Sequence, residues 1–169
     1  MMRRLGESEE NILIVQSNIA NSYEMLGRLE QCLRMRQDVY LGRLRLSGKE
    51  HRETLISAVN YAVSLRDLKR FEETKALLRK TVPVARRVLG ENKEVTLRIR
   101  LIYVEALFLD DGATLDDLRE SVTTLEEIER TARRVFGGAH PLTTAIEDAL
   151  QDARAALRAR ETPAVASDK

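Results

Sequence analysis

Several residue types are scarce in this sequence, and each shortage excludes a class of protein. The 169 residues include one cysteine, Cys32, two histidines and no tryptophan. A lone cysteine cannot form an intramolecular disulfide, which excludes a small secreted fold held together by disulfides. One cysteine and two histidines also provide too few ligands for a zinc site, so no metal is expected. Aromatic residues make up only 4% of the chain, so the core must be built from aliphatic contacts.

An excess of one charge and a long apolar run are also missing. The 28 Lys and Arg residues nearly balance the 27 Asp and Glu residues, for a net charge of +1. A protein that binds nucleic acid or an anionic membrane surface generally carries a basic excess, so neither partner is expected. No apolar run reaches the roughly 18 residues of a membrane span, and residues 1–6 do not resemble a signal peptide. These absences predict a soluble, intracellular and therefore cytoplasmic protein.

An internal repeat organises the chain. Gly6, Gly48 and Gly90 are spaced 42 residues apart, and Gly137 continues the series after 47 residues. Other residues keep the same register, for example Asn18 with Asn60 and Tyr61 with Tyr103. A fixed period of this length is typical of solenoid proteins, in which each repeat packs on its neighbours.

Each period contains two amphipathic segments with helical spacing of their apolar residues. The predicted helices cover residues 10–26, 29–46, 52–68, 71–89, 93–109, 114–136 and 141–160. The sequence thus predicts repeats at 6–47, 48–89 and 90–136, a capping helix at 141–160, and a disordered tail at 161–169. The longer third period predicts an extended turn near 110–118, with Thr114 and Asp117 capping the helix that follows.

These repeats resemble tetratricopeptide repeats. Small residues occur at Ala20 and Ala62, and the segments 27–30 and 70–74 match the turn and the start of the second helix in that family. The 42-residue period, together with Arg86-Arg87-Val88-Leu89-Gly90-Glu91, is similar to the longer repeats of kinesin light chains. Cys32 and Thr74 stand where the family usually has alanine, and both are small enough for closely crossing helices.

The resemblance implies an all-α, right-handed α-solenoid of about three antiparallel helix pairs plus a C-terminal capping helix. It also implies that the first helix of each pair lines a concave, peptide-binding face. The residues expected on that face are Asn18, Asn21, Asn60, Val63, Arg66, Arg98, Leu101, Ile102, Glu105 and Phe108. Asparagine amides can donate and accept hydrogen bonds with an extended peptide backbone. A clamp for a peptide carboxylate needs cations at the positions that Ser17 and Ile102 occupy, so such a clamp is not favoured. The third repeat is instead expected to provide an apolar wall of Leu101, Ile102 and Phe108.

The sequence therefore predicts a protein-interaction module without a cofactor, whose partner is a protein or peptide. No nucleophile–base constellation indicates an enzyme, and the equivalent histidines His51 and His140 are interpreted as turn or capping residues. An alternative is a structural subunit of a larger assembly or of a longer repeat array, held through its ends or convex face. Residues 2–5 resemble the last turn of a preceding helix, which leaves self-association through the N-terminal end as a further expectation.

Overall fold

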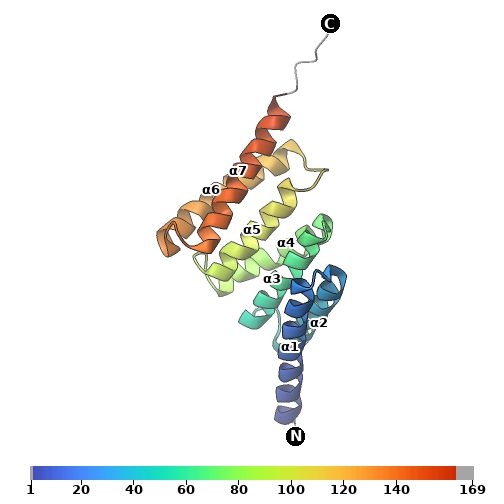
Figure 1. Cartoon of the computed structure of the whole chain (residues 1–169). Coiled ribbons are helices and arrows are strands. Elements are labelled where there is room, and N and C mark those ends of the chain that lie inside the picture. Colours follow the sequence, from blue (N-terminus) through green and yellow to red (C-terminus); the bar gives the residue numbers. More distant parts are fainter. Residues whose placement is uncertain (1, 163–169) are drawn as a thin grey trace.

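The computed structural model describes the backbone of residues 2–162 and the side chains of residues 8–162. Its seven helices are α1 (Met2–Met25), α2 (Leu29–Ser47), α3 (Arg52–Asp67), α4 (Phe71–Val88), α5 (Glu94–Phe108), α6 (Leu115–Phe136) and α7 (Pro141–Glu161). They form an α-solenoid, as predicted, with α1 at one end and α7 at the other (Figure 1). Of the predicted tail, Glu161 belongs to α7, and residues 163–169 lie outside the described residues.

Turns and caps determine where the helices end. Gly27, Gly48, Gly90 and Gly137 all have positive φ angles, which suit glycine and stop the preceding helix. Thr114 and Asp117 form the predicted reciprocal capping box at the start of α6. The extended turn before it includes Asp110, whose Oδ1 accepts a hydrogen bond from the Gly112 amide. These local signals explain why six of the seven predicted helices match the structure closely.

The start of α1 differs from the prediction. Gly6 was expected to mark a repeat boundary, with residues 2–5 ending an earlier helix, but α1 runs continuously from Met2 to Met25. At the later boundaries, His51 and His140 accept backbone hydrogen bonds at the starts of α3 and α7. Glu9 occupies the place of His51 in the 42-residue register. Glutamate favours a helix interior over an N-cap, so the helix is not interrupted there.

Each helix packs on the next one along the chain. In addition, α3 packs on α5, and α5 packs on α7. The buried core consists of two clusters, one from α3, α4 and α5 and one from α5, α6 and α7, and the partly buried Tyr103 packs against both. Small residues lie where paired helices cross. Cys32 is 1% exposed, and Thr74, Ala20 and Ala62 are each 0% exposed. The small positions predicted from the sequence are therefore confirmed as close-packing sites.

Candidate protein-interaction groove

The first candidate surface is a shallow groove between α1 and α3, with α2 as its floor. Among the described residues, α1 packs on α2 and not directly on α3, whereas α3 packs directly on α5. A pocket of about 140 Å³ occupies this space. We call it the α1–α3 groove; its lining residues are Leu13, Ile14, Ser17, Asn18, Val39, Arg43, Glu53, Ile56, Ser57 and Asn60. The structure thus brings together Asn18 and Asn60 from the predicted site.

The two asparagine amides of this groove are available for a ligand. Asn18 is exposed and Asn60 is half-buried. Their backbone carbonyls accept hydrogen bonds from Ser22 Oγ (3.2 Å) and Arg36 Nη1 (3.3 Å), respectively. Within residues 8–162, neither side-chain amide makes a hydrogen bond. Each amide can therefore offer both a donor and an acceptor to an incoming chain.

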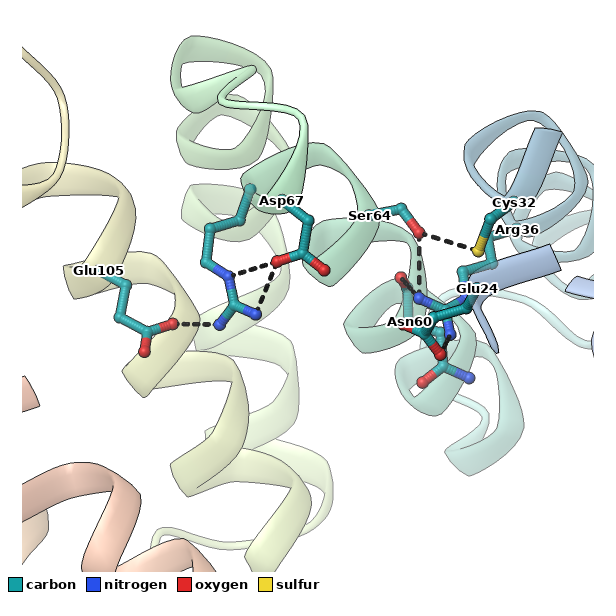
Figure 2. A network of polar contacts seen from close by, with 8 residues as sticks. Glu24, Cys32, Arg36, Asn60, Ser64, Asp67 and Glu105 are labelled. Atoms are coloured by element: carbon teal, nitrogen blue, oxygen red, sulfur yellow. Dashed lines mark hydrogen bonds and ion pairs between the residues drawn. The ribbon is translucent and has the colours of Figure 1, made fainter. Parts of the chain in front are cut away.

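A buried arginine from α2 connects the two walls of the groove. The Arg36 side chain is 8% exposed and reaches between α1 and α3. Arg36 Nη2 donates to Glu24 Oε2 at 2.7 Å, while Nη1 donates to Ser64 Oγ at 3.0 Å (Figure 2). Arg36 Nη2 also donates to Asn21 Oδ1 at 3.5 Å. Ser64 also contacts Cys32 Sγ at 3.5 Å. Because Asn21 already accepts from Arg36, its amide oxygen is less available to a ligand than those of Asn18 and Asn60.

A second polar cluster links α3 to α5. Arg66 donates to Glu105 on α5 and to Asp67 beside it on α3 (Figure 2). Burial raises the pKa of Glu105, and the charge of Arg66 opposes this shift. Burial alone would lower the pKa of Arg66, but Glu105 and Asp67 raise it. The predicted residues Arg66 and Glu105 are therefore brought together as an ion pair, in which Arg66 offsets part of the cost of burying the Glu105 carboxylate.

The remaining predicted site residues do not form an open apolar wall. Leu101, Ile102 and Phe108 are 5%, 2% and 9% exposed and belong to the hydrophobic core. The prediction that they line a peptide-binding wall is corrected: α5 contacts α3, α4, α6 and α7, so nearly all of its apolar surface is covered. Val63 is half-buried against the same core. Arg98 is exposed and pairs with Glu94 at 2.8 Å.

Sequence reasoning missed Arg36, although a signal for it exists. In the repeat register, Arg36 corresponds to Leu78 and Leu125, and both of these leucines are 0% exposed. An arginine at a position that is otherwise a core leucine predicts a buried cation with nearby acceptors. The acceptors come from α1 and α3, however, and that pairing is visible only once the helices are placed in space.

The two histidines cap helices. The Nδ1 atoms of His51 and His140 accept backbone hydrogen bonds at 3.3 Å and 3.2 Å, which confirms the capping interpretation. No group of three or more His, Cys, Asp or Glu side chains within residues 8–162 is placed to hold a metal ion. None of the described helices has the length and apolar character required to cross a membrane.

Comparisons with known proteins agree with this architecture. A family model described as "Tetratricopeptide repeat" matches residues 54–92. Among solved structures, the crystal structure of BtubC (BKLC) from P. vanneervenii is similar with a TM-score of 0.66 and 14% sequence identity. The similarity covers 90% of this chain and 63% of BtubC, so the chain spans less than two thirds of that protein. A search of curated proteins found no matching sequence.

Residues 54–92 therefore match the tetratricopeptide repeat family, and the arrangement of the helices resembles the fold of BtubC. The repeat predicted at 48–89 overlaps the segment that the family model matches. Tetratricopeptide repeats generally mediate protein–protein interactions.

Proposed function

We propose that this chain is a non-catalytic interaction module that binds an extended peptide segment of a partner protein in the α1–α3 groove. The observation that carries the proposal is the pair of amides, Asn18 and Asn60, facing the same pocket with no intramolecular hydrogen bond within residues 8–162. Polar groups at such a surface that are not used within the fold can pair with the backbone of a bound chain.

The floor of the groove supports the same proposal. Leu13 and Val39 are 8% and 6% exposed and lie beneath the amides, and Ile56 is half-buried at the edge. An extended peptide could therefore place a small apolar side chain between the two helices while its backbone contacts the amides. Binding sites of this type combine a few polar contacts with apolar burial.

Charge contributes less to this groove than the sequence suggests. Arg43, which lines the groove, pairs with Glu10 at 3.6 Å, and Arg36 is held by Glu24. Arg66 and Arg98 do not line the groove, and they pair with Glu105 and Asp67 and with Glu94, respectively. A ligand carboxylate would have to displace one of these internal partners before it could pair with an arginine. We therefore propose that the ligand is recognised through its backbone and apolar side chains rather than through an acidic terminus.

A peptide-display selection tests this function and requires no identified partner. Short random peptides would be selected on the full chain, and the affinity of the enriched peptides would be measured by fluorescence anisotropy. Replacing Asn18 and Asn60 by alanine removes two sets of hydrogen bonds to the peptide backbone. At about 1 kcal/mol each, this loss weakens binding by roughly 30-fold.

The matched control is Gln37→Ala combined with Gln151→Ala, which removes two exposed amides on α2 and α7 that do not line the groove. This control should bind the selected peptides with the affinity of the wild type. The proposal fails if no peptide is enriched, or if the Asn18→Ala/Asn60→Ala variant binds the peptides as tightly as the control does.

A second candidate function is that of a structural subunit held through its ends or its convex face. One observation favours it: large apolar side chains are exposed on α1, including Ile12 at 53% and Val15 at 56%. Apolar patches on a repeat protein mark interaction surfaces. The two candidate functions use different sides of α1, so the same protein could perform both.

A further inference from the structure

An apolar stripe runs along the side of α1 that faces away from α3. Ile12, Val15 and Ile19 are 53%, 56% and 39% exposed, and their spacing of three and four residues places them on one side of the helix. Leu41 of α2, 44% exposed, lies across a groove of about 880 Å³ that Ile12 also lines. We call Ile12, Val15, Ile19 and Leu41 the N-terminal face.

The repeat register shows that these positions serve as interfaces elsewhere in the chain. Ile12 corresponds to Thr54, Thr96 and Thr143, which are 2%, 0% and 0% exposed. Val15 corresponds to Ser57, Ile99 and Ile146, which are 5%, 0% and 0% exposed. In α3, α5 and α7 these positions are covered by the helix pair that precedes them. In α1 the equivalent positions are exposed, although their side chains are apolar.

The residue types on α1 indicate what kind of partner covers this face. Thr54 and Thr96 donate their hydroxyls to the carbonyls of Arg43 (3.2 Å) and Ala85 (3.4 Å), near the end of the preceding helix. Isoleucine at position 12 cannot make this bond. The N-terminal face therefore lacks the polar contact that Thr54 and Thr96 make with the preceding helix, and it presents apolar side chains to a partner instead.

The opposite end of the solenoid does not provide such a surface. A groove of about 520 Å³ between α6 and α7 is lined mainly by charged residues, including the ion pairs Arg154–Glu126 and Arg133–Glu147. Within the described part of α7, no large apolar residue is exposed. Head-to-tail stacking would press the apolar stripe against these charges and bury them, which is costly. An apolar face that meets its own copy avoids that cost and closes the assembly.

We propose that a second copy of this chain docks on the N-terminal face, so that two α1/α2 pairs pack about a two-fold axis. The whole flank of the α1/α2 pair, about 20 Å wide and about 29 Å long from the 19 residues of α2, presents at most roughly 600 Å² per copy. The two copies would together bury up to about 1,200 Å², the lower end of the range for specific complexes. The dimer is therefore reversible. This inference rests on the second candidate function and does not depend on peptide binding in the α1–α3 groove.

Sedimentation equilibrium of the full chain, over a range of about 1 to 200 µM, tests the proposal. The wild type is expected to approach twice 19.2 kDa at the highest concentrations. Ile12→Thr combined with Val15→Ser installs the residues found at the equivalent positions of α3, and this variant should remain monomeric throughout. The matched control, Val88→Ser with Val135→Ser, removes two valines of similar exposure (39% and 43%) on α4 and α6 and should dimerise like the wild type.

Circular dichroism would show that all variants keep the helicity of the wild type, because exposed substitutions change stability by about 0.5 kcal/mol or less. A monomeric wild type over the whole range would overturn the proposal, as would an open series of larger oligomers. Equal weakening by the control would also overturn it. If the Ile12→Thr/Val15→Ser variant still dimerises, the assigned surface is wrong while the structural-subunit function survives. Unchanged affinity of selected groove peptides for this variant would show that the two functions are separate.

Discussion

Replacing Arg36 tests how the two walls of the α1–α3 groove are held together. The Arg36→Ala variant loses the hydrogen bond to Glu24, which is charge-assisted and contributes about 1.5 kcal/mol because Glu24 is 41% exposed. It also loses the bond to Ser64, at about 1 kcal/mol. Removing two buried methylenes costs roughly another 1.6 kcal/mol. The expected loss in the free energy of unfolding is therefore about 4 kcal/mol.

Arg36→Leu separates the packing contribution from the polar one. Leucine is the residue at the equivalent positions Leu78 and Leu125 in the other repeats, so it can fill the same space. Replacing a buried charge by a well-packed apolar side chain is often nearly neutral. We expect the free energy of unfolding of Arg36→Leu to lie within about 1.5 kcal/mol of the wild-type value. It should exceed that of Arg36→Ala by at least about 2 kcal/mol.

Urea unfolding followed by far-ultraviolet circular dichroism measures these differences. Arg34→Ala is the control, because Arg34 is an exposed arginine on the same helix and its loss should cost about 0.5 kcal/mol or less. If Arg36→Ala costs as little as Arg34→Ala, then the polar bridge between α1 and α3 contributes nothing to stability. If Arg36→Leu and Arg36→Ala are equally unstable, the reasoning about a shared core position is refuted.

Three further predictions concern the helix ends and the buried ion pair. Thr114→Ala should lower the free energy of unfolding by about 1 kcal/mol by removing one half of the capping box with Asp117, whereas Thr114→Ser should not; equal melting temperatures would contradict this. Lys69→Gly should raise the melting temperature, because Lys69 has a left-handed φ of 56° that glycine adopts without strain, and a decrease would show that this conformation is not strained. Burial raises the pKa of Glu105, so the folded state takes up its proton first as the pH falls. As the pH falls from that raised pKa to the ordinary value of 4.5, the free energy of unfolding of the wild type should therefore increase relative to that of Glu105→Gln. Urea titrations that show a relative decrease over this range would contradict a raised pKa.

The repeat pattern was sufficient to predict the fold because each repeat has its own local signals. Positive-φ glycines, the Thr114 cap and the two histidine caps act within a few residues of the helix ends they determine. Apolar periodicity then fixes which side of each helix is buried. The start of α1 was the exception: glycine at position 6 suggested a boundary, but Glu9 replaces the capping histidine of the later boundaries, and the helix continues.

The site was predicted less completely because it depends on contacts between repeats. The expected wall of Leu101, Ile102 and Phe108 is buried because α5 is covered by neighbours on both sides, which a helical wheel of α5 alone does not reveal. Asn18 and Asn60 do face a common pocket, but only because α1 leaves α3 uncovered there. Spacing along the chain identifies the exposed sides of helices, and only the packing between them determines which sides form a groove.

The central claim is that a partner peptide binds between α1 and α3, and nuclear magnetic resonance tests it most directly. A selected peptide would be titrated into isotope-labelled full chain, and the backbone and asparagine side-chain amide signals would be followed. The account predicts that the largest shifts occur at Asn18, Asn60 and the neighbouring lining residues Ser17 and Ile56. Shifts confined to α6 and α7, with the signals of the α1–α3 groove unchanged, would contradict it.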